Sequence, residues 1–462
     1  MKMKTNLAFL SSLILFSAVF ISGLFNSEWV SEQAFASPQP LPERQTLLSS
    51  YQAAIKRSET IGIDIELINQ AEERYRQAIG AILPNVSVVG SYLRQEQPDN
   101  ASSALYPGGQ PLLKIQGTQV LFRGFREFAG LRQSQKLTQA SQQDERQART
   151  LLFNDVVQNF YTVLGLEKTL ANYNSETGAY ENRIKELRQR VRIGRSRESE
   201  VLTVQASLAG LRAQIESAKG QLNVARELYA FLTGMPAETP LTDDQPLLRN
   251  VPPVEYYING VEQRPDVAAN KIRLNATEES LAIAKGAYLP SADFTGNYYL
   301  HRFGATANVG WDIQFLATFP LYAGGAIDSS VRQAASQIHQ YELNMSLARR
   351  QADEQIRAAY RTYAADQQQV EALRGSKLAN ERNLKAELTD YRLGLVTNLD
   401  VLNALISYQE SERALDQQIF TTKLDYLRLE STAGMNAWIG APAEPTIQSS
   451  AFSFPEWFRK AP

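Results

Sequence analysis

The chain has 462 residues, of which 44% are hydrophobic and 21% charged, and its formal net charge is -2. Such a near-neutral chain gives no reason to expect nucleic acid as a partner, because binding to phosphates needs a dense basic face. It contains no cysteine. A disulfide framework, a thiolate metal site, a cysteine nucleophile and an acylated amino-terminal cysteine are therefore all excluded.

An export signal is predicted at the amino terminus. Lys2 and Lys4 supply positive charge, an apolar stretch covers residues 7–25, and Ala34-Phe35-Ala36 offers small residues for cleavage. We expect a signal peptide over residues 1–36; an uncleaved inner-membrane anchor is the alternative. The remaining sequence contains no apolar run of spanning length, so it would have to cross a membrane as strands.

The sequence after this signal contains the same unit twice. Val191-Arg192-Ile193-Gly194 recurs about 200 residues later as Tyr391-Arg392-Leu393-Gly394. The two copies are joined by the proline-rich residues 236–253, through which a helix cannot continue. We expect a first structural repeat over residues 37–250, a second over residues 251–440 and a short tail over residues 441–462. Further matches in the same order pair Gly80–Pro84 with Gly286–Pro290, Leu121 with Leu321, Gly124 with Gly324, Phe160 with Tyr360, and Gly234 with Gly434.

Each repeat opens with a helical segment that ends at a Leu-Pro pair, followed by two short segments of alternating apolar and polar residues. These segments are residues 86–92 and 113–121 in the first repeat, and residues 293–300 and 309–319 in the second. A period of two predicts strands with one apolar and one polar face. Such strands are typical of a transmembrane barrel, although a soluble sandwich with one wet face fits the same pattern.

The number of predicted strands has a consequence for assembly. Four strands cannot close a barrel, because the smallest closed barrels need about eight. An open edge is not tolerated in lipid, so several protomers must share one barrel if these strands span the membrane. The strand count therefore predicts an oligomer.

Unusually long helices are predicted after the strands. Residues 126–190 contain no proline, and a helix of that length would measure on the order of 100 Å. The return segment repeats apolar residues at three- and four-residue intervals, which predicts a coiled-coil seam. A solid four-helix bundle would explain this seam but not the strands. The seam residues are Val201, Val204, Leu208, Leu211, Ile215, Ala218, Leu222, Ala225, Tyr229 and Leu232.

The chain resembles the TolC-like outer-membrane efflux protein family over nearly its whole mature length. The fold that the resemblance implies is mainly α with a small transmembrane β part. Three protomers would form one twelve-stranded barrel in the outer membrane, continued by an α-helical tunnel across the periplasm. The residues that carry the resemblance are Arg264-Pro265-Asp266, Ala287–Pro290, Phe319–Gly325, Tyr391–Gly394 and Asp400-Val401-Leu402.

The resemblance also implies a function and partners. The homotrimer would passively conduct substrates of an efflux or type I secretion system, with a periplasmic adaptor and an inner-membrane pump docked at the far end of the tunnel. An exported periplasmic coiled-coil adaptor or scaffold protein without a pore is the alternative. An adaptor would need only one helical hairpin inserted in small β domains, whereas this chain repeats strands and hairpin twice.

The glycines of the repeated motif are expected to lie at hairpin tips. Gly194 and Gly394 fall where a long helix must reverse, and glycine adopts the required positive φ at little cost. By the resemblance, the adaptor recognises these tips at the periplasmic end. The expected docking residues are Arg192, Ile193, Gly194, Leu393, Gly394 and Leu395.

A periplasmic gate is also implied by the resemblance, with polar links from the second-repeat tip to the first-repeat helix. Three copies of Asp400 on a pore axis would form an acidic ring that selects cations. Asn403 stands where some family members carry a second acid, and Val396 stands where an arginine can bridge. A solvated aspartate that complements a helix dipole is the alternative for Asp400. The expected gate residues are Asp400, Asn403, Tyr391, Glu200 and Ser199.

The sequence offers no plausible catalytic or cofactor site. His301 and His339 have no neighbours spaced for a metal site or a triad, and no phosphate-binding glycine loop of the Walker type occurs. Arg264-Pro265-Asp266 is interpreted as a helix start, because proline favours a first turn and the carboxylate complements the dipole. We expect no enzyme activity and no cofactor, so a partner must supply the energy for transport.

Overall fold

The computed structural model describes most of the chain, namely residues 44–96, 108–247, 250–304 and 306–435. The predicted signal peptide over residues 1–36 and the tail over residues 441–462 lie outside these residues. All helices and strands described below belong to one compact unit that starts at Gln45.

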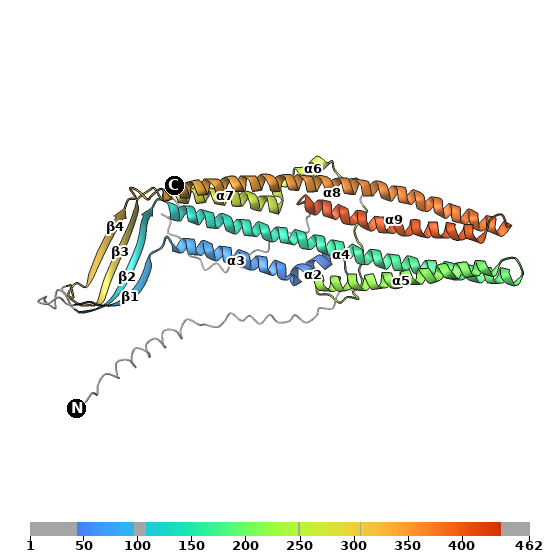
Figure 1. The fold of residues 1–462 in the computed structure, drawn as a ribbon, viewed down its shortest axis with the longest axis horizontal. Coiled ribbons are helices and arrows are strands. Elements are labelled where there is room, and N and C mark those ends of the chain that lie inside the picture. The colour runs from blue at the N-terminus through green and yellow to red at the C-terminus, as the bar shows by residue number, and fades with distance from the viewer. Residues whose placement is uncertain (1–43, 97–107, 248–249, 305, 436–462) are drawn as a thin grey trace, which may run out of the picture. The chain divides into compact units, whose positions relative to one another are not determined.

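The same order of elements occurs in both halves of this unit (Figure 1). A helix leads into two strands, a very long helix follows, and a shorter helix returns beside it. Short helices precede each half, namely α2 (Leu47–Arg57) in the first, and α6 (Val254–Ile258) and the 3₁₀ helix η1 (Val261–Gln263) in the second. The first half contains α3 (Glu59–Gly80), β1 (Asn85–Arg94), β2 (Gly109–Arg123), α4 (Arg126–Arg192) and α5 (Glu198–Thr233). The second half contains α7 (Pro265–Gly286), β3 (Ser291–Arg302), β4 (Trp311–Thr318), α8 (Ala326–Leu393) and α9 (Asn398–Thr432).

The four predicted strands are confirmed, and they form one antiparallel sheet in the order β1-β2-β3-β4. Ile115 pairs with both Val88 and Tyr298, and Tyr298 pairs with Trp311. Paired residues point to the same face of a sheet, so these four side chains form one apolar row. All four are exposed in the single chain. The sheet therefore presents an uncovered apolar face.

The opposite face of the sheet is polar and internally hydrogen-bonded. Ser87, Gln116, Asn297 and Asp312 form the corresponding row on this face. Lys114 Nζ donates to Asn297 Oδ1 at 2.9 Å, and Asn297 Nδ2 donates to Asp312 Oδ1 at 2.7 Å. Strands that separate lipid from water have this division between an apolar and a polar face.

The long helices are confirmed as α4, with 67 residues, and α8, with 68 residues. Helix α5 packs along α4 and α9 packs along α8, so each half contributes an antiparallel hairpin. The predicted seam of α5 faces inward, since its residues are buried or half-buried. None of the described helices combines the length and the apolar character that a membrane span requires.

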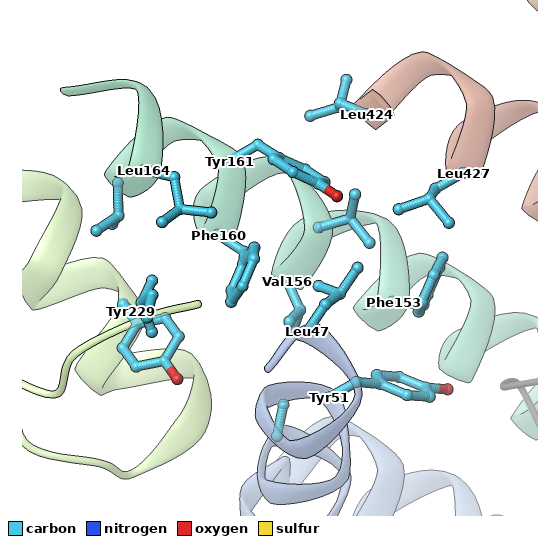
Figure 2. Close-up of a cluster of buried hydrophobic side chains, with 14 of the residues drawn as sticks. Leu47, Tyr51, Phe153, Val156, Phe160, Tyr161, Leu164, Tyr229, Leu424 and Leu427 are labelled. Carbon is cyan, nitrogen blue, oxygen red and sulfur yellow. The ribbon is translucent and has the colours of Figure 1, made fainter. Parts of the chain in front are cut away.

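Helices α2, α4, α5 and α9 meet in an apolar cluster, called here the central core (Figure 2). Phe153 and Phe160 of α4 are fully buried among Tyr51 of α2, Tyr229 of α5 and Leu427 of α9. The rings of Tyr51 and Phe153 meet edge to face with centroids 5.1 Å apart. Full burial contributes about 1.5–3 kcal/mol for each large apolar side chain, so this core fixes where the four helices cross.

The strand-to-helix junctions of the two halves differ in how tightly they pack. Gly124 has a φ of +68°, and a Cβ there would overlap the backbone carbonyl of Gly286 at the end of α7. Gly324 occupies the equivalent place in the second half, with a φ of +61° and open space around it. Gly124 is thus required both by its positive φ and by the close contact with Gly286, whereas Gly324 is required by its positive φ alone.

Candidate functional site

The hairpins α4–α5 and α8–α9 end in matching turns, called here the first tip (residues 185–200) and the second tip (residues 385–400). Gly194 and Gly394 have φ values of +72° and +78°, as the sequence predicts for helix reversals. In each turn the residue after the glycine donates its N–H to the carbonyl oxygen five residues earlier, at 2.8 Å in the first tip and 2.9 Å in the second. This pattern satisfies the last carbonyls of a helix and requires a left-handed residue.

The side chains predicted to dock the adaptor lie on the surface of the tips. Ile193, Leu393 and Leu395 are exposed to 66%, 70% and 72%, and Arg192 is also exposed. Apolar side chains at this exposure contribute little to the packing of their own chain. They are available to a partner.

Asp400 lies at the start of α9, where it forms a capping box with Thr397. The N–H and the hydroxyl of Thr397 donate to Asp400 Oδ2 at 2.8 and 2.7 Å. These hydrogen bonds hold the pKa of the Asp400 carboxyl below its usual range. The carboxyl is exposed and charged, so its role as a helix cap leaves it open to solvent.

Of the other polar residues predicted for the gate, Asn403 lies one helical turn after Asp400 on α9, whereas Ser199 and Glu200 lie on α5 in the first tip. Asn403 and Ser199 are exposed, and Glu200 accepts a hydrogen bond from Ser196 Oγ at 2.8 Å. In the part of the chain that the structure describes, no hydrogen bond joins Glu200 or Ser199 to the second tip. A contact of Ser199 or Glu200 with the second tip would therefore be one between protomers.

Tyr391 is the one predicted gate residue that contacts the other repeat directly. It is buried at the end of α8, beneath two arginines of α4. The guanidinium carbons of Arg183 and Arg190 lie 4.1 and 4.5 Å from the centre of the Tyr391 ring. A cation held over an aromatic face in this way is attracted by the ring quadrupole.

The two arginines also bind polar groups on either side of this ring. Arg183 Nε donates to Asn398 Oδ1 at 2.8 Å, in a contact buried between α4 and α9. Glu186 accepts from Arg183 Nη1 at 2.8 Å and pairs with Arg190 Nη2 at 3.1 Å. We call the set Arg183, Glu186, Arg190, Tyr391 and Asn398 the tip link.

An apolar cluster lies beside the tip link and joins both hairpins. Leu187 of α4, Val201 of α5 and Leu402 of α9 are buried in it together with Tyr391. The two tips therefore form one packed structure in the single chain, held by apolar contact as well as by the charged groups.

Four members of the tip link were not identified from the sequence, although the duplication carries a signal for them. Where the first repeat has Arg183 and Arg190, the second has Asn383 and Asp390. Conversely, Tyr391 and Asn398 replace a valine and a glutamate of the first repeat. These differences between the repeats are the signal in the sequence that points to the tip link.

Between the tips and the central core, helices α4 and α9 are joined by polar pairs. Arg413 Nη1 donates to Glu176 Oε2 at 2.5 Å, and Asn172 Nδ2 donates to Asp416 Oδ2 at 2.8 Å. Burial raises the pKa of Glu176, which the charge of Arg413 opposes. Polar contacts of this kind can be exchanged for water more easily than an apolar core can be opened.

No metal centre is found among the described residues, where no three His, Asp or Glu side chains are grouped to hold an ion. Arg264 and Asp266 form a local ion pair of 2.7 Å at the start of α7, with Pro265 in its first turn. The interpretation of this motif as a helix start is confirmed.

An amphipathic sheet continued by two long helical hairpins is the architecture of known channel-tunnel proteins. The crystal structure of VceC, an outer membrane protein of Vibrio cholerae, matches with a TM-score of 0.74 over 84% of this chain and 96% of VceC, at 17% identity. BepC, an outer membrane efflux protein of Brucella suis, is 23% identical over 300 residues, or 63% of this chain and 64% of BepC. TtgC, a probable efflux pump outer membrane protein of Pseudomonas putida, is 24% identical over 366 residues, or 74% of this chain and 73% of TtgC.

The sequence model of the family described as "Outer membrane efflux protein" matches residues 36–234 and 260–429, and the chain belongs to this family. It is an outer-membrane channel-tunnel protein for efflux, with its helical part in the periplasm. The family consists of transport proteins, not enzymes, and its members are trimeric components of tripartite efflux or secretion systems. The predicted family, fold class and location are thus confirmed.

Proposed function

We propose that three copies of this chain close one twelve-stranded sheet in the outer membrane, with the apolar row facing lipid and the polar row facing water. The support is the sheet itself: its apolar row is exposed, and within the described residues β1 and β4 each have one unpaired edge, which another copy can pair. A band on a gel that runs as a trimer until heated, and as a monomer afterwards, is the expected result. A purified protein that remains monomeric in detergent contradicts this assembly.

The periplasmic entrance is closed by the tip link. Arg183 and Arg190 hold the end of α8 and the start of α9 against α4 through Tyr391 and Asn398. The polar pairs between α4 and α9 above the tips separate when the second hairpin moves outward. The tip link is the observation on which this gate depends.

The exposed Asp400 carboxylates of the three protomers form an acidic ring at this entrance, with Asn403 beside them. Glu200 and Ser199 of the first tip face the neighbouring protomer's second tip. Rings of carboxylates attract cations and bind multivalent ones most strongly. The supporting observation is that Asp400 is charged, exposed and fixed by its cap.

A periplasmic adaptor and an inner-membrane pump bind the tips and open this gate. A partner shifts the equilibrium between the closed and the open channel only if it binds the open state more tightly. The partners must therefore contact the exposed apolar residues Ile193, Leu393 and Leu395 more fully in the open state. The chain itself catalyses no reaction and uses no cofactor, and the pump supplies the energy. A scaffold without a pore is disfavoured, since it would leave the apolar sheet face without a function.

Conductance in planar bilayers tests the gate. Arg183→Ala removes one of the two guanidinium groups over Tyr391 and the hydrogen bond to Asn398, so the open fraction and the mean conductance should rise. Arg212→Ala is the matched control, because Arg212 forms an exposed pair with Glu181 at 3.7 Å, outside the tip link. Equal conductance of both variants and the unmodified channel would exclude a role of the tip link in closure.

A further inference from the structure

We propose that the first tip binds a carboxylate-bearing surface of the adaptor, whereas the second tip is recognised by apolar contact. This inference rests on the docking role proposed above and specifies the chemistry of the partner. The first tip carries six basic and three acidic residues over residues 185–200. The equivalent residues 385–400 carry two basic and three acidic residues. The two tips of one chain thus have opposite net charge.

Most cations of the first tip are not used within the chain. Among the described residues, five exposed cations of this tip take part in no ion pair, while Arg190 is engaged by Glu186. Glu186, the nearest acid on α4, is already shared with Arg183. The five free cations are Lys185, Arg188, Arg192, Arg195 and Arg197.

These cations point away from the tip link. Lys185, Arg188 and Arg192 are spaced as neighbours on one face of α4. Arg183 and Arg190 occupy the opposite face, where they contact Tyr391. One face of the helix end therefore holds the gate, and the other presents positive charge to solvent.

Helix stabilisation explains only part of this charge. A cation such as Arg192 at the carboxyl end of α4 complements the helix dipole. Arg195 and Arg197 precede the amino end of α5, where the dipole disfavours cations. Arg197 is moreover the N-cap of α5 and makes no capping hydrogen bond. Glu198 and Glu200 in the first turn of α5 offset this cost in part.

The second tip has the residues that helix stability favours at the same places. Thr397 stands where the first tip has Arg197, and it forms a capping box with Asp400. Leu395 stands where the first tip has Arg195. The second tip forms the same turn with Leu395 and Thr397, so the turn does not need the basic pair. A binding partner with negative charge gives the pair a function.

The apolar surface of the second tip is the counterpart of this patch. Leu393, Leu395 and Leu399 are exposed to 70%, 72% and 56%. In the first tip only Ile193 remains apolar among the equivalent positions. The adaptor surfaces that bind the two tips therefore differ. Carboxylates of the adaptor are attracted by the cations of the first tip, whereas at the apolar second tip they would lose their water without gaining a partner.

Photo-crosslinking in cells that carry the native adaptor tests this inference. p-Benzoylphenylalanine replaces Gln189, which is exposed in the first tip, or Thr389, its equivalent in the second. Mass spectrometry then identifies the partner peptide in each adduct. We expect an adaptor peptide rich in Asp and Glu at Gln189, and one without such an excess at Thr389. A neutral or basic peptide at Gln189, or an anionic cell-wall glycan in its place, overturns the inference.

Charge variants complete the experiment. Combined Arg192→Glu, Arg195→Glu and Arg197→Glu should reduce the adduct at Gln189 at least tenfold and leave the adduct at Thr389 unchanged. The milder pair Arg195→Leu and Arg197→Thr copies the second tip, so it keeps the turn intact, and it should reduce the same adduct several-fold. An undiminished adduct in both variants contradicts the inference.

The controls separate this inference from the docking role. Arg350→Glu alters an exposed cation on α8 outside both tips and should change neither adduct. Heat-modifiable trimers confirm that each variant assembles. If adaptor adducts form at Thr389 but not at Gln189, the inference of an acidic partner at the first tip is contradicted, while the docking role stands. Their absence at both positions overturns the docking role itself.

Discussion

The guanidinium carbon of Arg183 lies 4.1 Å from the centre of the Tyr391 ring, so the helix of one repeat is fastened to the hairpin end of the other. Arg183 is nearly buried, and one of its terminal nitrogens has no hydrogen-bond partner among the described residues. The Tyr391 ring therefore compensates the positive charge at this terminal nitrogen of Arg183.

Tyr391→Phe should leave the channel closed, whereas Tyr391→Ala should open it. Phenylalanine keeps the aromatic face, but alanine removes an attraction of about 2 kcal/mol, which corresponds to a roughly thirtyfold change in the ratio of open to closed channels. Single-channel recording measures this ratio. If Tyr391→Phe opened the channel as much as Tyr391→Ala, the phenolic hydroxyl and not the ring would carry the link.

Asp400→Asn should lower cation selectivity and weaken block by multivalent cations. The amide keeps a hydrogen-bond acceptor for Thr397 while removing the charge, so α9 remains capped. Reversal potentials and block by a trivalent cation in planar bilayers measure the effect. Asp390→Asn, which changes a carboxylate at the end of α8, serves as the control. Unchanged block in Asp400→Asn would remove this residue from the gate.

Asp425 makes the stability of the second hairpin depend on pH. Burial and the neighbouring Asp366 raise the pKa of Asp425 to about 6. Gln418 donates to Asp366 at 2.9 Å, and Arg428 of α9, which also contacts Gln158 of α4, lies 3.3 Å from Asp425. Between its ordinary pKa and about 6 the folded state keeps a proton that the unfolded state releases. Stability therefore falls as pH rises through this window and is level above it.

Asp425→Asn should remove this dependence. The variant should be more stable than the unmodified protein at about pH 7.5, by on the order of 2 kcal/mol, and nearly equal at about pH 4. Thermal unfolding of the purified trimer at the two pH values measures the difference. A constant difference at both pH values would show that the pKa of Asp425 is not raised in the folded protein.

Gly124→Ala should destabilise the protein more than Gly324→Ala. Both residues have positive φ, which costs alanine about 1 kcal/mol or more, but only at Gly124 does the new Cβ meet the carbonyl of Gly286. The difference between the denaturation midpoints of the two variants measures the cost of the overlap with Gly286. Equal loss of stability would mean that α7 can move away from the junction.

Arginine should be tolerated on one face of the sheet and not on the other. Ile313→Arg places a charge on the apolar face and should cost about 2–4 kcal/mol if it lies near the bilayer midplane. Gln314→Arg, one residue further, places the same charge on the polar face. The yield of folded trimer in outer-membrane fractions distinguishes them. Equal yields would contradict the assignment of the faces.

Periodicity accounts for most of what the sequence predicted correctly. The seam from Val201 to Leu232 and the alternation in residues 293–300 are local patterns that follow from helix and strand geometry. The tip glycines follow from the positive φ that a helix reversal requires. The contact of Gly124 with Gly286 and the pair of Asp366 with Asp425 join separate elements. No local pattern predicts them, because their partners depend on how the helices pack.

In the proposed gate, the central core also determines how far the entrance can open. Helix α9 is held there by Leu424 and Leu427, and its other end lies at Asn398, roughly 40 Å away at 1.5 Å per residue. A rigid tilt of α9 by about 10° around these two leucines would displace its end at Asn398 by about 7 Å. In the proposed trimer, three such helices that tilt together would change the aperture by more than the width of a small molecule while the strands stay in place.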